Sequence, residues 1–478
     1  MENQSRRVFL KNAAVLTAGL TAGAASTTAF ATPTPTAVID ANNKTRMPSG
    51  ANDKVRMGFI GIGNRGSELL GLFMQQPDCE VAALCDIYEP YLQRDRSKVN
   101  PRWIEIYGAK IPKMGEQFPV KPKLYDDFRK LLEDKSIDAV CIATPDHWHA
   151  YITIAAIAAG KDVYCEKPLT NTLVEGRKMV EAQAASKQVV AVGMNRRGNI
   201  AYQQLAKLVH DGKLGKIVRG RSVYASDLYP NGIGKLQPED PPKDFNWDMW
   251  LGPRAYRPYQ YNIAPYMFRW WNDYSSQLGN WGVHHMDAMR WLMSETAPLY
   301  ISAHGGRFVL DHDATINDTD VVTFEFASGK IMTYEILEST GGYGLFPYGE
   351  LEIRGTQGVT FAHEGGYRIR PNGPGQFQRW ERPFEEVVFD NQMRLLNDAS
   401  SADSTTGLIR NFLDCIKSRN TPLCPLEEGH RSTSFAHLAN IASVVKDRLQ
   451  WDATNERFVN NDKANALLSY EYRAPWKL

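Results

Sequence analysis

The motif Gly61-Ile62-Gly63-Asn64-Arg65-Gly66 constrains the fold of this chain more than any other feature of its sequence. The apolar run at 55–60 predicts a strand before the motif, and the amphipathic stretch at 64–75 predicts a helix after it. Backbone amides in such a turn, together with the dipole of the helix, can bind a pyrophosphate. The motif therefore predicts a dinucleotide-binding, doubly wound parallel sheet, with cofactor contacts from Gly61, Gly63, Asn64, Arg65 and Gly66.

Asp86 supports this interpretation and indicates which dinucleotide is bound. It ends a second predicted strand, 80–85, and follows Gly66 by 20 residues. A carboxylate at that place accepts hydrogen bonds from the adenosine ribose and repels a 2′-phosphate. We therefore expect NAD as the cofactor. The alternative is a tight structural turn followed by a solvated aspartate.

Strands and helices alternate along the first part of the chain, as they do in a Rossmann domain. We assign this domain to residues 53–193. Its further predicted strands are 138–143, 163–165 and 189–192, and its further predicted helices are 126–133, 149–159 and 172–186.

The pattern changes after residue 193, where longer runs alternate between apolar and polar residues. Such alternation predicts strands that bury one face, so we expect an α+β domain at 194–404 with a large, open, mainly antiparallel sheet. Residues 405–478 are predicted to form C-terminal helices and a tail that pack back on both domains, with helix over 405–448. The predicted strands are 218–224, 300–309, 320–326, 330–336 and 350–354.

A Pro-, Trp- and Tyr-rich insertion at 229–280 is too irregular to predict a core element. Loops of that length are usually functional, and aromatic rings beside hydrogen-bonding groups suit the faces and hydroxyls of a sugar. Tyr266, Arg269 and Trp270 are therefore candidate substrate ligands. The alternative is that these aromatic side chains cover the sheet and form a subunit contact.

The chain begins with a twin-arginine sequence, Ser5-Arg6-Arg7-Val8-Phe9-Leu10-Lys11, and a weakly apolar stretch that closes on Ala29-Phe30-Ala31. This pattern predicts a signal peptide for twin-arginine translocation at 1–31, a linker at 32–52 and a periplasmic or otherwise exported protein. The stretch is too interrupted to span a bilayer well, so we expect no stable membrane insertion after cleavage. A membrane anchor and a general secretory signal are the alternatives. Because free nicotinamide cofactor is scarce outside the cytoplasm, NAD would stay bound and be recycled within the site.

The charge balance favours no nucleic-acid or membrane partner, and the cysteine pattern bears on the state of the thiols. The 55 basic and 54 acidic side chains leave no excess that would favour nucleic acid or an anionic membrane surface. The six cysteines have no repeated spacing, and several lie in apolar runs, which favours buried thiols. Export would nevertheless permit a disulfide.

Two further motifs follow strands of the parallel sheet, at the edge where such sheets bind ligands. They are Thr144-Pro145-Asp146-His147-Trp148-His149 and Cys165-Glu166-Lys167-Pro168-Leu169. With these motifs in this order, the chain resembles the glucose-fructose oxidoreductase, inositol dehydrogenase and rhizopine-catabolism family (Gfo/Idh/MocA). The resemblance covers nearly everything after Lys54, including Met194-Asn195-Arg196-Arg197.

The resemblance implies that Lys167 lies beside the nicotinamide and the reacting hydroxyl, and that Glu166 helps to position the cofactor. An ammonium is disfavoured beside a positively charged nicotinamide, so Lys167 would be driven toward its neutral form and could act as a base. A surface ion pair between these two residues is the alternative. Further cofactor contacts are expected from Thr144, Pro145, His147, His149 and Asn195.

In the family, a later stretch commonly reads Asp-x-x-x-His, and its histidine assists proton transfer. Here His284 occupies the histidine position and Asn280 the aspartate position. An amide cannot take up a proton as a carboxylate can, so Asn280 would orient a sugar hydroxyl while Lys167 and His284 carry the acid and base chemistry. Further candidate substrate ligands are Arg197, His285 and Asp287; a core position for His285 and a helix cap by Asp287 are the alternatives.

A metal site is a competing interpretation of the histidines. His147, His149, His284, His285 and Asp287 include the ligand types that zinc uses. No Cys or Glu partner recurs at ligand spacing, and the family resemblance accounts for the same residues. We therefore predict no metal.

These observations favour an NAD-dependent oxidoreductase that acts on a ring hydroxyl of a sugar or glycoside. The alternative is a redox-neutral NAD-dependent glycosidase or lyase, which would oxidise, eliminate, hydrate and reduce. Such enzymes typically lack a Glu-Lys-Pro motif, which this chain retains. A non-enzymatic sugar sensor is the third hypothesis. We also expect a homo-oligomer, a dimer or tetramer, because the open sheet leaves one face exposed.

Overall fold

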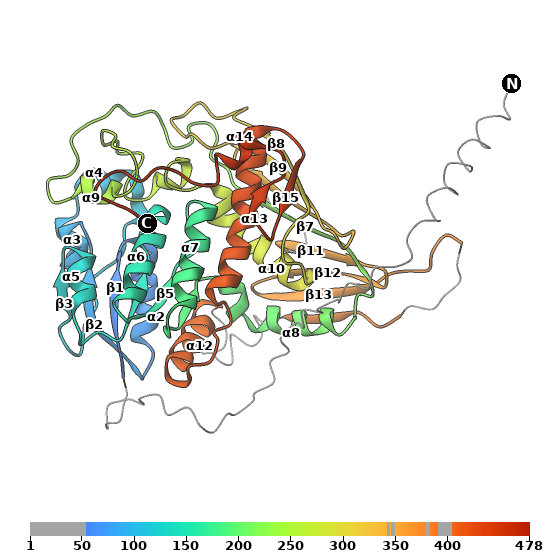
Figure 1. Ribbon diagram of the computed structural model, residues 1–478, viewed down its shortest axis with the longest axis horizontal. Coiled ribbons are helices and arrows are strands. Elements are labelled where there is room, and N and C mark those ends of the chain that lie inside the picture. Colours follow the sequence, from blue (N-terminus) through green and yellow to red (C-terminus); the bar gives the residue numbers. More distant parts are fainter. Residues whose placement is uncertain (1–53, 342–344, 346–348, 378–382, 391–403) are drawn as a thin grey trace. The chain divides into compact units, whose positions relative to one another are not determined.

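The computed structural model describes residues 54–341, 345, 349–377, 383–390 and 404–478 (Figure 1). Residues 50–478 form one compact unit, within which all the described elements lie. The predicted signal peptide at 1–31 and the predicted linker at 32–52 fall outside the described residues.

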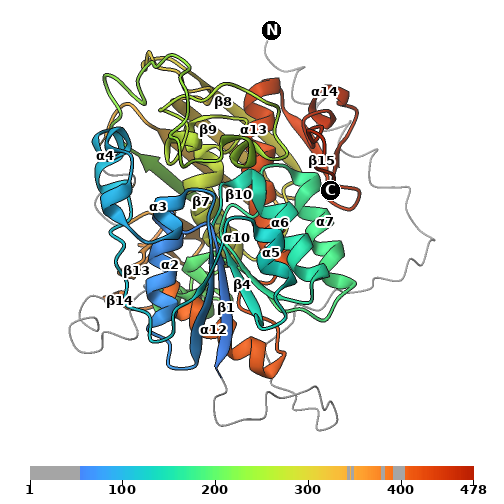
Figure 2. The ribbon, with the colours of Figure 1, turned by 90° about the vertical axis from the view of Figure 1, so that its left-hand side faces the viewer.

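The first sheet is parallel, with the strand order β3-β2-β1-β4-β5-β6. This is the order of the doubly wound dinucleotide-binding fold. Figure 2 shows α2 on one side of the sheet and α5, α6 and α7 on the other. Because helices cover both faces, the central strands are buried along almost their whole length. The strands are β1 (Val55–Ile60), β2 (Cys79–Cys85), β3 (Lys123–Tyr125), β4 (Ala139–Ile142), β5 (Asp162–Cys165) and β6 (Val190–Val192).

The helices of this part begin where the sequence supplies a cap or a turn. Asp127 caps α5 through the amide of Arg129, and Thr172 with Glu175 forms a capping box at the start of α7. The helical segments are α2 (Asn64–Met74), α3 (Glu89–Leu92), α4 (Pro101–Tyr107), α5 (Phe128–Glu133), α6 (Asp146–Ala158), α7 (Leu173–Ala184) and the short turns Arg96–Lys98, Gly108–Lys110 and Asn195–Gly198.

The second sheet has the order β14-β13-β12-β11-β7-β10-β9-β8-β15-β16. Its neighbours pair antiparallel except for β7 and β10, which run parallel, so the predicted mainly antiparallel sheet is confirmed with one parallel pair. The strands are β7 (Ile217–Ala225), β8 (Tyr300–Gly306), β9 (Thr319–Glu325), β10 (Ile331–Leu337), β11 (Leu351–Gly355), β12 (Gly358–His363), β13 (Gly366–Pro371), β14 (Val387–Asp390), β15 (Leu449–Asp452) and β16 (Arg457–Phe458).

Three helices bury one face of this sheet: α8 (Ile200–His210), α10 (Val283–Met293) and α13 (Leu426–Val445). Leu205, Met289 and Phe435 from these helices share one core cluster with Phe324 of β9. The helical stretch predicted over 405–448 consists of two helices. It is divided into α12 (Ser404–Ser418) and α13 by a segment that contains Pro422 and Pro425, because proline cannot continue a helix. The last helix is α14 (Asp462–Asn465).

The aromatic insertion at 229–280 differs from its predicted character. It contains the short helix α9 (Trp247–Leu251), a tight turn at Met267–Trp270 and a wide, π-type turn at Leu278–Gly282. Trp247, Trp250 and Tyr259 are buried in the same cluster as Trp103 of α4. Much of the insertion is therefore core that joins the first sheet's helices to the second domain, despite its irregular backbone.

All six cysteines are free and buried. The expectation of buried thiols is confirmed. No helix among the described residues is long and apolar enough to cross a membrane.

Candidate active site

The glycine turn between β1 and α2 leaves no room for a side chain at Gly61 or at Gly66. Gly61 has a φ of +80°, and a Cβ on Gly66 would lie 1.9 Å from the carbonyl oxygen of Gly61. Only glycine permits this approach. The first turn of α2 is thereby held against the end of β1, where its free amides are suited to a pyrophosphate.

Asp86 is fixed at the end of β2 by backbone amides. Its Oδ2 accepts a hydrogen bond from the amide of Ile62 at 2.9 Å, and its Oδ1 accepts one from the amide of Tyr88 at 3.0 Å. Burial raises the pKa of this carboxyl to about 6, so it is mainly ionised at neutral pH. A carboxylate has lone pairs left after two such bonds, as hydrogen bonding to ribose hydroxyls requires.

A cavity of about 420 Å³ lies at the carboxyl ends of β1, β2, β4 and β5. Thr144 contributes a buried hydroxyl that has no hydrogen-bond partner among the described residues. This orphaned oxygen and the glycine turn both fit a bound dinucleotide. The predicted site residues that line the cavity are Gly61, Gly63, Asn64, Arg65, Asp86, Thr144, Pro145, Glu166, Lys167, Asn195, Tyr266, Arg269, Asn280 and His284.

Lys167 reaches across the cavity to the second domain. Its Nζ donates to the backbone oxygen of Asn280 at 2.9 Å and to the Oδ1 of the same residue at 3.1 Å. The pKa of this amine is lowered to about 8, chiefly by burial; Glu166 opposes the shift and the nearby guanidinium of Arg269 adds to it. The neutral amine is therefore well populated slightly above neutral pH.

The carboxylate of Glu166 binds Arg65, in the first turn of α2, rather than the side-chain amine of Lys167. It accepts hydrogen bonds from Nε of Arg65 at 2.9 Å and from the backbone amide of Lys167 at 3.0 Å. Arg65 also bonds Glu68 and, on α12, Thr405. Glu166 therefore links the lysine loop to the cofactor turn, and no ion pair is found between Glu166 and the Lys167 amine, both of which the structure describes, although such a pair had been the alternative interpretation.

His284 lies one turn after Asn280, at the start of α10. Its ring is buried, and no described group forms a hydrogen bond with its Nδ1. Burial, with the nearby cations Arg196 and Lys167, holds its pKa well below the usual range. The ring is therefore neutral at pH 7, and its unpaired nitrogen at a cavity suits hydrogen bonding to a substrate hydroxyl.

His147 and His149 hold the walls of the site and do not line the cavity. His147 Nε2 lies 2.8 Å from the carbonyl oxygen of Trp250, which ties α6 to the insertion. His149 lies between the carbonyl oxygens of Pro168, at 2.8 Å, and Thr144, at 2.9 Å. Their positions support the two loops that carry Thr144 and Lys167.

Four predicted substrate ligands lie outside the cavity. Arg197 pairs with fully buried Asp287 at 2.8 Å. Asp287 is not a helix cap, because it lies inside α10, which begins at Val283. His285 lies 3.3 Å from Glu350, and Trp270 donates to Glu338 at 2.6 Å. The structure therefore gives these four side chains partners within the protein and does not bring them to the cavity with Lys167 and His284.

Several cavity residues were absent from the predicted site, among them Trp281 and Glu364. Trp281 directly follows Asn280, which was in the predicted site, so this adjacency was a signal that could have identified Trp281. Glu364 lies in the turn between β12 and β13, which the sequence pattern did not predict. Among the described residues, no group of three or more His, Cys, Asp or Glu side chains is arranged to hold a metal ion.

Comparison with known proteins extends over both domains. A family model described as an oxidoreductase family with an NAD-binding Rossmann fold matches residues 55–194. A second, described as the C-terminal alpha/beta domain of an oxidoreductase family, matches residues 198–338 and 389–478. These matches confirm the expected NAD-binding domain.

Several known proteins are similar in sequence or fold. An inositol 2-dehydrogenase of Saccharopolyspora erythraea is 26% identical over 75% of this chain and 88% of its own length. A glycosyl hydrolase family 109 protein of the same organism is 28% identical over 47% of this chain, which spans about half (46%) of that relative's length. A levoglucosan dehydrogenase, solved with NADH and levoglucosan, has 18% identity and a TM-score of 0.59, covering 83% of this chain and 99% of that one.

Proposed function

Because the chain belongs to the Gfo/Idh/MocA oxidoreductase family, we propose that it oxidises a ring hydroxyl of a sugar or glycoside, with NAD as the hydride acceptor. The observation that carries this proposal is the pair of Lys167 and His284 at one cavity with the cofactor turn. His284 is buried and Lys167 is half-buried, and the pKa of each is lowered, so that His284 is neutral at pH 7 and the neutral amine of Lys167, which can accept a proton from a hydroxyl, is well populated slightly above neutral pH.

The two side chains would divide the work on one hydroxyl. The neutral amine of Lys167 would take the hydroxyl proton, and NAD, when bound at the cofactor turn, would supply the acceptor for the carbon-bound hydrogen as hydride. His284 offers its unpaired Nδ1 to the same or the neighbouring hydroxyl and orients it. Asn280 keeps the lysine amine directed into the cavity through two hydrogen bonds.

A redox-neutral glycosidase or lyase is the second candidate, favoured by the similarity to glycosyl hydrolase family 109 proteins. The same oxidation would acidify a neighbouring carbon–hydrogen bond, after which a glycosidic substituent is eliminated, water adds, and the ketone is reduced. No cofactor is consumed in that sequence. It would therefore suit an exported protein, and we propose that the protein is exported with NAD already bound.

The experiment is a Lys167→Ala substitution in protein that carries bound NAD. We expect hydride transfer to a panel of glycosides to slow by about 10³-fold, the usual contribution of a positioned base, while the bound NAD is retained. Formation of NADH absorbance in a single turnover measures the first, and cofactor content measures the second. Lys187→Ala, at an exposed lysine away from the cavity, is the control. Unchanged turnover in Lys167→Ala would contradict the assignment.

Deuterated water separates the two candidate reactions. The protein is incubated with glycosides in deuterated water without added cofactor, and the products are examined by mass spectrometry and NMR. Net oxidation predicts a ketone in amounts up to the bound NAD. The redox-neutral reaction predicts released sugar that carries deuterium beside the oxidised carbon.

A further inference from the structure

Trp281 presents an aromatic ring at the cavity although packing does not require it there. It lines the cavity and is 38% exposed, and no other tryptophan in the described part of the chain counts as exposed. An indole left at a wet surface loses the free energy that its burial would contribute. Such a residue at a cavity is a candidate ligand contact.

The orientation of this indole is fixed by a second ring. Trp281 stacks on Tyr224 of β7, with 4.9 Å between ring centroids and 18° between ring planes. Because Tyr224 covers one face, the exposure falls on the rest of the ring. A flat, immobilised aromatic face is the surface on which the apolar face of a sugar ring packs at little entropic cost.

Trp281 lies next to the residues proposed to act on the reacting hydroxyl. It follows Asn280 in the wide turn Leu278–Gly282, and Asn280 holds the Nζ of Lys167. The cofactor turn and Asp86 belong to β1 and β2 of the first sheet, whereas Tyr224 belongs to the second sheet. The aromatic face is therefore beside the position of the reacting hydroxyl, on the second-domain side.

Glu364 supplies a polar group in the same cavity. Its side chain is 45% exposed, accepts a hydrogen bond from Nδ2 of Asn195 at 3.1 Å, and lies 3.3 Å from Nη1 of Arg196. A carboxylate has about four lone-pair sites, so acceptor capacity remains for hydroxyl donors. Its negative charge also disfavours a ligand that carries a carboxylate or phosphate at this place.

We propose that Trp281 and Glu364 form an outer subsite that holds a second, uncharged sugar ring of the substrate. The first ring would be held at Lys167 and His284, and the second would pack on the indole and donate a hydroxyl to Glu364. This rests on the proposed function, and it specifies the substrate as a neutral disaccharide or longer glycan in preference to a free monosaccharide.

The test compares a neutral disaccharide with the monosaccharide of its reacting ring. In the wild-type protein, the second-order rate constant of single-turnover NADH formation should be higher for the disaccharide. Trp281→Ala should lower the ratio of the two values by roughly 3- to 10-fold, the range that corresponds to one aromatic stacking contact. Trp281→Phe should keep most of the wild-type ratio, and Glu364→Gln should lower the ratio less than Trp281→Ala does. Phe308→Ala, at a 69% exposed ring that does not line the cavity, is the matched control.

A binding measurement separates this proposal from the proposed function. Calorimetric titration of Lys167→Ala protein with the disaccharide should show binding that the added Trp281→Ala substitution weakens by a similar factor. If neither sugar is oxidised by the wild type while this binding difference persists, the proposed reaction is wrong and the subsite stands. An unchanged ratio and unchanged binding in Trp281→Ala would overturn the subsite.

Discussion

The contact between Lys167 and Asn280 sets the proton chemistry of the site at the scale of single residues. Asn280 accepts the same hydrogen bonds that an aspartate would accept, but it brings no negative charge. A carboxylate at this distance would favour the ammonium form of the lysine. The amide therefore directs the amine while leaving its pKa at about 8, where burial has placed it.

Asn280→Asp should consequently move the pH dependence of oxidation upward. The reaction needs the neutral amine, so activity rises as pH passes the pKa of Lys167. The added carboxylate stabilises the charged form and should raise that pKa by about one unit or more. The pH at which kcat/KM reaches half of its maximum, the midpoint, measures this pKa. Asn272→Asp, at an exposed asparagine outside the main cavity, should leave the midpoint in place, and an equal midpoint in both variants would contradict the role of Asn280.

At the scale of elements, the docking of α2 on the end of β1 depends on one glycine. In Gly66→Ala, the new Cβ would meet the carbonyl oxygen of Gly61 at 1.9 Å, so the helix must move away from the turn. We expect loss of bound NAD and a lower melting temperature. Gly71→Ala, in the same helix, meets nothing within 4 Å and should stabilise the protein by up to about 1 kcal/mol. Thermal unfolding with and without added NAD measures both. Equal behaviour of the two variants would contradict the argument.

The strands of the second sheet show which elements a sequence pattern can predict. Period-two alternation was sufficient to predict β7 to β11, because each of these strands buries one face. β12 and β13 begin with Gly358 and Gly366, and β13 ends on Pro371, residue types that are depleted in strands. Because these two strands were not predicted, Glu364, which lies in the turn between them, was missing from the predicted site. The parallel pairing of β7 with β10 joins residues more than a hundred positions apart, which no local pattern encodes.

Motifs predicted cavity residues best where they follow strands of the parallel sheet. Gly63, Thr144, Glu166 and Lys167 line the cavity because the carboxyl ends of parallel strands meet at one edge. Arg197 and Asp287 could not be excluded from the sequence alone. Their mutual ion pair depends on how the turn Asn195–Gly198 packs on α10.

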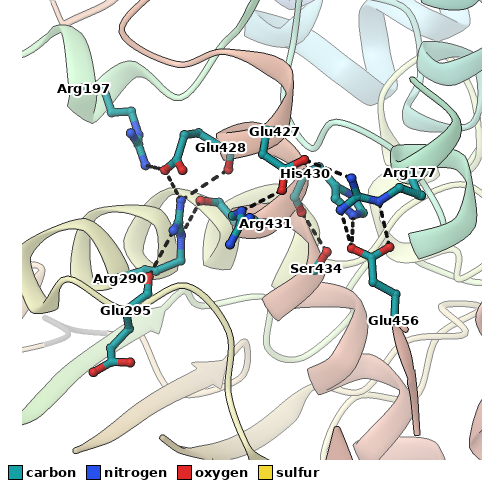
Figure 3. Close-up of polar contacts among 11 residues, drawn as sticks. Arg177, Arg197, Arg290, Glu295, Glu427, Glu428, His430, Arg431, Ser434 and Glu456 are labelled. Carbon is teal, nitrogen blue, oxygen red and sulfur yellow. Dashed lines mark hydrogen bonds and ion pairs between the residues drawn. The ribbon is translucent and has the colours of Figure 1, made fainter. Parts of the chain in front are cut away.

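At the scale of the whole molecule, the first turn of α13 connects segments that are far apart in the chain (Figure 3). Glu427 bonds Arg177 of α7 at 3.0 Å, which reaches the helices of the parallel sheet. Glu428 binds Arg197 at 3.0 Å and also pairs with Arg290 of α10. Carboxylates suit the first turn of a helix because its free amides carry partial positive charge. α13 therefore fastens both domains at one end.

Arg197 is the residue on which this connection depends most, because it also neutralises Asp287. Arg197→Met would leave a fully buried carboxylate without its cation, which should cost about 3–5 kcal/mol of unfolding free energy. Replacing Asp287 by Leu in the same chain should recover part of that loss. Arg448→Met, at an exposed pair with Glu325, should cost about 0–1 kcal/mol. Urea unfolding measures these values, and a loss in Arg197→Met no larger than in Arg448→Met would contradict the assignment.

The buried, unpaired cysteines have a consequence for where this protein can mature. Since none of the six thiols is cross-linked, the folded unit owes none of its stability to covalent bonds between side chains. Burial also raises the pKa of every one of these thiols, which keeps them protonated and unreactive. The chain can thus fold under reducing conditions, and in oxidising surroundings it needs no enzyme that forms or rearranges disulfides.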